Sequence, residues 1–400
     1  MELFTARPHL ASITKQNANR LHTPLSSSLQ PHKRAISEIS RSRLSRLRTI
    51  VRCTQRKPDG EDFKLSRQSY LQGTLALALT IVESSSPLEG LAATLPPIEG
   101  NQEDIVIPME FISGGYFCKF AIEGGRSIRG QLDTGSPFLI LDKGSYEDQG
   151  QISPYGDTYE RYASHEGDVR WDKGTVNFTE SINTNSDSGA RVFKDVVYGV
   201  FQTFVNVGGG TEVIIGLVKN KVPRIRPTFL GQTDLRSMQF DFITNQFTLS
   251  RRGLIPPMVD TIPLVDIRQL FNAPVQQFVG KVKSFYINDR LVRTGGSNQP
   301  IYAMIDTGTT GLFVVENMFY PLQKESKGWR SAEVDFETSS GKIVTLRASR
   351  PSPLFLVFPT KFDWLPPDAN LIILGVAFLQ DSVLTIDTQT NRFALDVPAA

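Results

Sequence analysis

Two short motifs of the same kind contain the residues best suited to chemistry. An Asp-Thr-Gly-Ser run occupies residues 133–136, and an Asp-Thr-Gly-Thr run occupies residues 306–309. Each follows apolar residues and precedes a second apolar segment, 138–141 or 312–315, so each aspartate is expected at the end of a strand. A single Asp-Thr-Gly is often only a turn, but two copies in matching settings favour a paired function.

The chemistry of two neighbouring carboxyl groups explains why such a pair is useful. Carboxyl groups a few ångströms apart do not both ionise, so they share one proton and titrate together. If the fold brings Asp133 and Asp306 together, one activates a water molecule as general base and the other donates a proton as general acid. The sequence therefore predicts hydrolysis without a covalent intermediate.

The remaining residues of the two motifs are expected to support this pair. Thr134 and Thr307 are expected to hydrogen-bond across the interface and hold the two loops in register. Ser136 and Thr309 are expected to donate to the outer carboxylate oxygens and so to favour the ionised form. The glycines of the two motifs, Gly135 and Gly308, are expected to allow a tight reversal with positive φ.

The scarcity of other reactive side chains excludes several mechanisms. The chain has 400 residues but only 4 His and 2 Cys. Three of the histidines precede residue 33, so a His-dependent nucleophile would rest on His165 alone. A Cys/His zinc site needs about four ligands, so we expect no metal. Outside the N-terminal segment no basic stripe indicates nucleic acid.

The first hundred residues have the composition of targeting segments. Residues 1–52 carry ten Lys and Arg against two Glu, which predicts a disordered transit peptide; a basic arm is the alternative. Residues 53–104 include the apolar run 71–82, which is too short to span a bilayer and is typical of a second targeting signal. An interfacial helix or a pro-segment is the alternative. We expect a chloroplast protein of the thylakoid lumen or stroma, without stable membrane insertion, or otherwise a mitochondrial one.

The rest of the chain reads as mostly β and duplicated. Short runs rich in Val, Ile and Phe alternate with Gly and Asn clusters, and 316–324 is the best candidate for a short helix. After each Asp-Thr-Gly motif comes an aliphatic pair ending in glycine, at 214–216 and 373–375. Similar closing segments follow at 240–249 and 386–395. These landmarks predict two homologous lobes, 105–252 and 259–400.

These motifs resemble those of the pepsin-like aspartic proteases over about residues 105–398. The resemblance implies two β-barrel-like lobes with pseudo-two-fold symmetry and a central cleft. It also implies a catalytic pair at Asp133 and Asp306, a polypeptide substrate and no cofactor. Short retroviral-type relatives build the same site from two chains, but one chain carries both copies here, so we expect a monomer.

One part of the family pattern has no single match in the sequence. Family members have a hairpin flap that carries a Tyr followed by a Gly-rich tip, and the sequence offers two aromatic residues for that place. Trp171, three residues before Gly174, and Tyr162, before the turn at 165–167, are the two candidates. An active endopeptidase is the first interpretation. A catalytically weak homologue that binds peptides or a partner protein is the alternative, and a purely structural role is a third.

Overall fold

A computed structural model describes most of the chain after residue 103. It covers residues 104–146, 150–162, 165–182, 191–206, 213–219, 226–293, 299–326 and 328–397. These residues all belong to one compact unit of the chain. The disordered transit peptide expected at 1–52 and, apart from Asp104, the second targeting signal expected at 53–104 lie outside the described residues.

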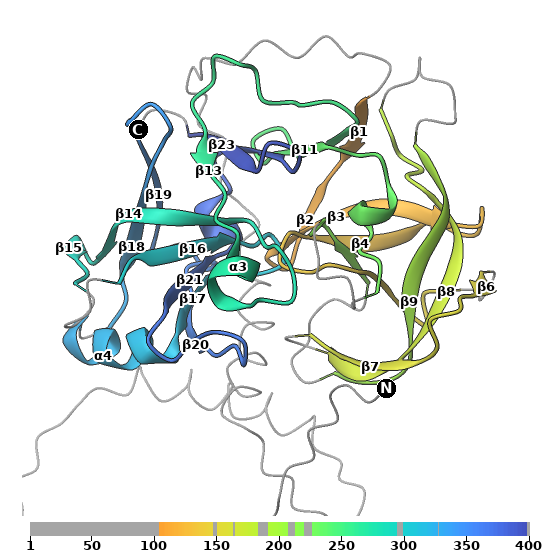
Figure 1. Cartoon of the computed structure of the whole chain (residues 1–400), viewed down its shortest axis with the longest axis horizontal. Helices are drawn as coiled ribbons and strands as arrows, with labels where there is room; N and C mark the ends of the chain where they lie inside the picture. The colour runs from red at the N-terminus through yellow and green to blue at the C-terminus, as the bar shows by residue number, and fades with distance from the viewer. Residues whose placement is uncertain are drawn as a thin grey trace, which may run out of the picture. The chain divides into compact units, whose positions relative to one another are not determined.

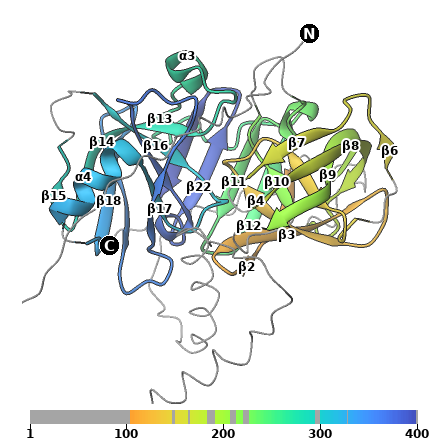
Figure 2. The same ribbon diagram turned by 90° about the horizontal axis from the view of Figure 1, so that it is seen from below.

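The described residues are mostly β, as predicted, and their strands form three sheets. Strands of the N-terminal half and strands of the C-terminal half gather on opposite sides (Figures 1 and 2). We call the sheet of the first half the N-terminal lobe, that of the second half the C-terminal lobe, and the one that joins them the central sheet.

The N-terminal lobe is a nine-stranded sheet among the described residues. Its members are β2 (Glu110–Ile112), β3 (Gly115–Ile122), β4 (Ile128–Asp133), β5 (Leu139–Asp142), β6 (Gln151–Ile152), β7 (Thr158–Arg161), β8 (His165–Asn177), β9 (Val192–Asn206) and β10 (Ile214–Gly216). A short 3-10 helix, η3 (Leu230–Gln232), follows β10 in the chain. Strand β8 is long enough to pair with β9 over most of its length and with β7 near its start.

The C-terminal lobe is an eight-stranded sheet within the same described part of the chain. Its members are β14 (Val279–Ile287), β15 (Arg290–Leu291), β16 (Ile301–Ile305), β17 (Leu312–Val315), β18 (Ser331–Glu337), β19 (Ile343–Ser349), β20 (Val357–Thr360) and β21 (Asn370–Leu374). Helix α3 (Ile267–Phe271) precedes the sheet, α4 (Glu316–Ser326) follows β17, and the 3-10 helix η4 (Val376–Phe378) follows β21. Helix α4 confirms the short helix expected at 316–324.

Both lobes contain the same arrangement of five strands, which is the structural form of the predicted duplication. In the N-terminal lobe the order is β3-β4-β10-β5-β9, and in the C-terminal lobe it is β14-β16-β21-β17-β20. In each, the third strand is parallel to the second and antiparallel to the fourth. The fourth is parallel to the fifth. Matching pairing directions at matching places relate the two lobes by pseudo-two-fold symmetry.

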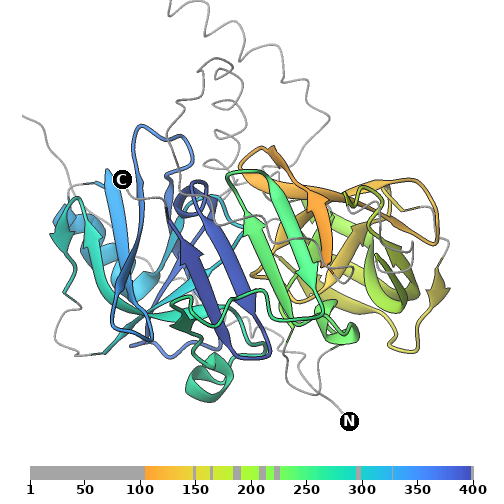
Figure 3. The same ribbon diagram turned by 90° about the horizontal axis from the view of Figure 1, so that it is seen from above.

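The central sheet is built from both halves of the chain, which the sequence analysis did not anticipate. Its order is β1 (Asp104–Pro108), β12 (Gln246–Ser250), β11 (Ser237–Asp241), β22 (Val383–Asp387), β23 (Arg392–Asp396) and β13 (Ile262–Pro263). Strands β11 and β22 pair antiparallel, with Met238 opposite Ile386. The two closing segments therefore lie side by side as a green and a dark blue hairpin (Figure 3).

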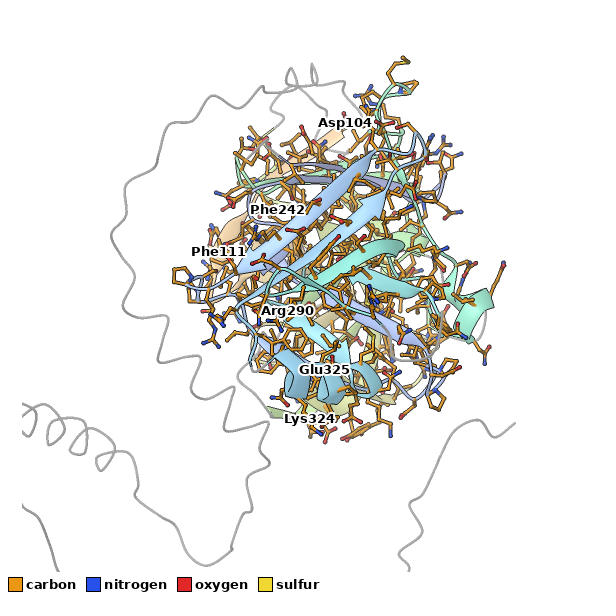
Figure 4. All side chains as sticks on the ribbon, turned by 90° about the vertical axis from the view of Figure 1, so that its left-hand side faces the viewer. Asp104, Phe111, Phe242, Arg290, Lys324 and Glu325 are labelled. Atoms are coloured by element: carbon orange, nitrogen blue, oxygen red, sulfur yellow. The ribbon has the colours of Figure 1, made fainter. Side chains whose placement is uncertain are left out.

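The core continues from the lobes into the central sheet. One cluster of buried residues includes side chains of all three sheets, such as Leu132, Phe240, Ile305 and Ile386. At its edge, the ring of Tyr116 lies 5.0 Å from Phe111 and 4.9 Å from Phe242, both labelled in Figure 4. These rings pack the N-terminal lobe against the central sheet.

The described residues lack both a membrane-spanning helix and a cluster of metal ligands. No helix there has both the length and the apolar character needed to cross a membrane. The same residues contain no group of three or more His, Cys, Asp or Glu suited to a metal ion.

Candidate active site

Corresponding strands of the two lobes position the two aspartates. Strand β4 ends at Asp133, and Asp306 directly follows the last residue of β16. Each of these strands pairs in parallel with a neighbouring strand, β4 with β10 and β16 with β21. The main-chain oxygen of Asp133 accepts from Leu217, and the amide of Asp306 donates to Leu374. Asp133 and Asp306 are each 9% exposed, so each side chain projects from a buried strand end.

The aliphatic-aliphatic-Gly elements have a steric reason. A Cβ added at Gly216 would lie 2.5 Å from the main-chain N and O of Phe138, and one at Gly375 would lie 2.5 Å from the carbonyl oxygen of Thr309. Any side chain there would push away the backbone that follows each Asp-Thr-Gly motif. Glycine therefore lets β10 and the residue after β21 pass directly against the loops that follow Asp133 and Asp306.

The two threonines hold the loops together through four hydrogen bonds. The amide of Thr134 donates to the hydroxyl of Thr307 (3.1 Å), and the amide of Thr307 donates to the hydroxyl of Thr134 (2.9 Å). Each hydroxyl then donates to a main-chain oxygen of the other lobe, Ile305 (2.9 Å) or Leu132 (2.7 Å). Both threonines are fully buried. This reciprocal pattern is the contact between loops that the motifs predicted.

The glycines of the motifs serve a different purpose from the one expected. Neither Gly135 nor Gly308 is among the residues with positive φ, so the expected reversal with positive φ is wrong. A Cβ on Gly135 would instead lie 2.6 Å from Cγ of Asp306, and a Cβ on Gly308 would collide with the Asp133 carboxyl in the same way. Glycine is required because each loop approaches the carboxylate of the other lobe.

Burial and mutual repulsion make the two carboxyl groups a coupled pair. Burial raises the pKa of Asp133 above its ordinary value, against the hydrogen bonds that it accepts. Burial also raises the pKa of Asp306, to well above the usual range, and the negative charge of Asp133 raises it further. The carboxyl groups hydrogen-bond to each other. The geometry therefore favours an ionised Asp133 beside a protonated Asp306.

The hydroxyls after the glycines make the pair asymmetric. Ser136 donates to Oδ2 of Asp133 at 2.5 Å, whereas the Thr309 hydroxyl donates to the main-chain oxygen of Asp306 at 3.0 Å. The amides of Gly135 and Gly308 donate to Oδ1 of Asp133 and Asp306 at 2.7 and 2.9 Å. A hydrogen bond from Thr309 to the Asp306 side chain also lowers the pKa of Asp306, as expected, but by less than the bond from the Gly308 amide. Asp133 still has one donor more than Asp306, because both the hydroxyl and the amide of Ser136 lower its pKa, and it therefore keeps the negative charge.

Two glutamines that the sequence analysis missed also bridge the lobes here. Gln131 donates through Nε2 to the main-chain oxygen of Gly308 (3.1 Å), and Gln277 donates to that of Gly135 (3.0 Å). Each therefore holds the glycine of the opposite motif. Gln131 stands two residues before Asp133 among apolar residues, a signal that was available; Gln277 is far from either motif and gave none.

The two flap candidates occupy different places. Tyr162 directly follows β7, and β7 pairs with β8 up to Arg161 opposite Glu166, so the chain reverses just beyond it. Its side chain packs against a small cluster of Phe138, Ile140, Val169, Trp171, Val197 and Phe201. The charge of Asp133 is among the causes, after burial and Glu160, that raise the pKa of Tyr162. Tyr162 therefore stands at a hairpin end close to the two aspartates.

Trp171 lies within β8 rather than at a turn. It stands opposite Gly199 of β9 and is 1% exposed. Its ring packs edge-on against Phe138 at 5.1 Å, and its Nε1 donates to the hydroxyl of Thr158 at 2.7 Å. The indole therefore supports the base of the β7–β8 hairpin, and it does not form the tip expected near Gly174.

A comparison with solved structures identifies the fold. A crystal structure of the aspartic proteinase from Irpex lacteus matches with a TM-score of 0.53 and 14% sequence identity. The match covers 74% of this chain and 98% of that one. The chain has an aspartic proteinase fold. No family model matches it, and no curated protein matches it in sequence, so the likeness to the aspartic proteinase fold lies in structure.

Proposed function

We propose that the chain is an aspartic-type endopeptidase that hydrolyses peptide bonds of polypeptide substrates. The observation that carries this proposal is the buried, hydrogen-bonded pair of Asp133 and Asp306, held by reciprocal bonds between Thr134 and Thr307. The aspartic proteinase fold of the chain supports the same reaction class. The proposed reaction needs no metal or cofactor, because both proton transfers use carboxyl groups.

The different protonation of the two aspartates assigns their roles. Asp133, the ionised member, takes a proton from a water molecule as that water attacks the carbonyl carbon of the peptide. Asp306 gives its proton to the carbonyl oxygen, which yields a tetrahedral diol. Asp133 then returns its proton to the leaving nitrogen, the C–N bond breaks, and Asp306 recovers a proton from the diol. The pair thus returns to its starting state.

Hydrolysis of a mixed peptide library tests this proposal directly. The purified chain is assayed over roughly pH 3 to 8, where such carboxyl pairs titrate, beside Asp133→Asn and Asp306→Asn variants. Cleavage by the wild type and its loss in both variants are expected. A folded wild type that binds peptides but cleaves none at any pH would instead establish the peptide-binding homologue. A folded wild type that neither cleaves nor binds peptides would leave a structural role.

The cellular location is a separate proposal. The basic segment 1–52 followed by the apolar run 71–82 supports import into the chloroplast. A fluorescent protein fused after residues 1–104 is expected to accumulate in chloroplasts, either in the stroma or in the thylakoid lumen. Accumulation in mitochondria would support the other organelle and would contradict this proposal.

A further inference from the structure

One face of the β7–β8 hairpin carries a chain of linked polar side chains. Thr158 and Glu160 are alternate residues of β7, so they project to the same side of the strand. Nε1 of Trp171 donates to the Thr158 hydroxyl at 2.7 Å, and that hydroxyl donates to Oε1 of Glu160 at 2.8 Å. These bonds hold the Glu160 carboxylate in one place although it is only half-buried.

The cationic side chain of Arg226 lies near this carboxylate but forms no ion pair with it among the described residues. The guanidinium of Arg226 stacks over the ring of Trp171, 5.7 Å from its centroid. Its charge acts on Glu160 and counters the rise in pKa that burial causes there. Within the described residues, no ion pair joins Arg226 to Glu160, and Nε of Arg226 is buried without a hydrogen-bond partner. The Nε–H group of the guanidinium therefore lacks a hydrogen-bond acceptor.

The residues that hold this pair of charges pack against the chain segment that follows Asp133. Trp171, under Arg226, lies 5.1 Å from the ring of Phe138, two residues beyond Ser136, and Tyr162 packs against the same cluster. Tyr162 extends the same side of the hairpin, two residues beyond Glu160. Its hydroxyl is buried without a hydrogen-bond partner. Burial raises the pKa of this hydroxyl, and the negative charges of Glu160 and Asp133 raise it further. A peptide bound at Asp133 would therefore place one of its side chains against Glu160 and Arg226.

We propose that Glu160 and Arg226 form a subsite that selects substrates with an amide side chain, Gln or Asn, near the bond to be cut. This inference rests on the proposed function. An amide presents a carbonyl oxygen to the guanidinium and an NH2 group to the carboxylate. It therefore satisfies both protein groups at once.

Other side chains meet an obstacle at the same place. An acidic side chain would face Glu160, and a basic one would face Arg226, and like charges brought together cost affinity. An aliphatic side chain would bury both polar groups and leave them without partners. The order Gln above Glu, Lys and Leu follows from these penalties.

A matched set of peptides tests this subsite. Each of four positions around the scissile bond is occupied in turn by Gln, Glu, Lys or Leu, and kcat/KM is measured with the full chain. One position is expected to favour Gln about tenfold over each of the other three, a factor that corresponds to about 1.4 kcal/mol. Equal rates at every position would overturn the proposal.

Two charge variants make the test specific to these residues. Glu160→Gln is expected to raise the rate for Glu relative to Gln at that position by about tenfold, because Arg226 is then unopposed. Arg226→Gln is expected to raise the rate for Lys instead, because the carboxylate of Glu160 remains. Glu337→Gln, which removes an exposed partner of Lys283 in the other lobe, is the control and is expected to leave the order unchanged.

The outcome separates this inference from the proposed function. Cleavage with a side-chain order that neither variant alters would refute the subsite and leave the endopeptidase intact. If the wild type cleaves nothing, dissociation constants of the same peptides replace kcat/KM. The order of affinities in wild type, Glu160→Gln and Arg226→Gln then supports or refutes the subsite without any turnover.

Discussion

Ser136 is the residue that distinguishes the two aspartates. Its hydroxyl donates to Oδ2 of Asp133 and its amide also lowers the pKa of that carboxyl, whereas on Asp306 the Thr309 hydroxyl lowers the pKa by less than the Gly308 amide does. A hydrogen bond to a charged acceptor contributes about 1.5–3 kcal/mol, which is enough to decide which carboxyl of a coupled pair ionises first. In the proposed reaction, the assignment of Asp133 as base and Asp306 as acid therefore depends largely on Ser136.

Removing that hydroxyl is expected to shift the acidic limb of the pH–rate profile. In Ser136→Ala the ionised form of Asp133 loses a donor, so its pKa rises and the acidic limb of kcat/KM moves up by about one pH unit. The measurement is hydrolysis of one peptide across the acidic range. Ser382→Ala, which removes a buried hydroxyl bonded to Leu379, is the control. An acidic limb that stays in place would contradict the role of Ser136.

The threonine pair is expected to contribute stability as well as alignment. Thr307→Val removes the acceptor for the Thr134 amide and the donor to Leu132, which leaves two buried main-chain groups unpaired. Because each unpaired group costs about 1–3 kcal/mol, we expect the free energy of unfolding to fall by about 2–4 kcal/mol. Urea denaturation measures this loss. Thr307→Ser keeps the hydroxyl, so its free energy of unfolding is expected to fall by much less. Equal losses in the two variants would show that the methyl group, and not the hydroxyl, provides the stability.

At the scale of the elements, close approach of backbone to backbone determines where glycine is required. Strand β10 runs against the loop after Asp133 so closely that Gly216 has no space for a methyl group. The C-terminal lobe repeats this contact at Gly375. The strand that covers each active loop is thus placed by the absence of a side chain.

Gly216→Ala is expected to lower both stability and activity. The new methyl group would have to displace the main chain at Phe138, and such overpacking costs about 1–3 kcal/mol. Because that segment directly follows the Asp133 loop, kcat is expected to fall as well. Thermal denaturation and peptide hydrolysis check the two effects. At Gly253 an added Cβ would meet only Oδ2 of Asp387, at 3.2 Å, so a Gly253→Ala variant with equal losses would contradict this explanation.

At the scale of the whole molecule, the lobes share a sheet and an interface and are expected to unfold together. Breaking the pairing of β11 with β22 would expose two strand edges, and separating the loops would leave the threonine bonds unmade. Trp171 reports on the N-terminal lobe, and Trp329 and Trp364 report on the C-terminal lobe. Variants that keep the tryptophans of one lobe are expected to show coincident urea transitions. Two separate midpoints would show independent lobes.

The buried pair also makes the stability of the molecule depend on pH. The pKa of Asp306 is raised in the folded protein, so the folded state holds a proton that the unfolded chain has released. Stability is therefore full below the pKa of an unfolded aspartate, roughly 3.9, and falls as pH rises towards the folded pKa. The slope is about 1.4 kcal/mol per pH unit where only the folded state holds the proton.

Asp306→Asn is expected to remove this dependence. The amide carries no charge at any pH, so the free energy of unfolding of the variant is expected to exceed that of the wild type increasingly between roughly pH 4 and pH 7. Urea denaturation at several pH values measures the difference. A wild type and variant whose stabilities stay parallel over that range would show that Asp306 is not protonated in the folded protein.

Local signals in the sequence predicted the two lobes and the approach of the two Asp-Thr-Gly loops. The two Asp-Thr-Gly motifs and the repeated landmarks around them predicted two β lobes, because strand periodicity and reactive residue types are local properties. The same local signals predicted the approach of Thr134 to Thr307, since duplication implies that equivalent loops meet across a symmetry axis. Organelle targeting and catalytic activity remain predictions.

The tertiary structure decided what depends on neighbours distant in the sequence. The two glycines of the motifs are required by the carboxylate of the opposite lobe, 171 residues away for Gly135 and 175 for Gly308, and not by their own backbone angles. Gln277 reaches Gly135, Tyr162 rather than Trp171 ends the hairpin near Asp133, and β11 pairs with β22. Composition and spacing determined the chemistry of single residues, whereas contact between separate strands decided which atoms meet, because those contacts form only when the chain packs.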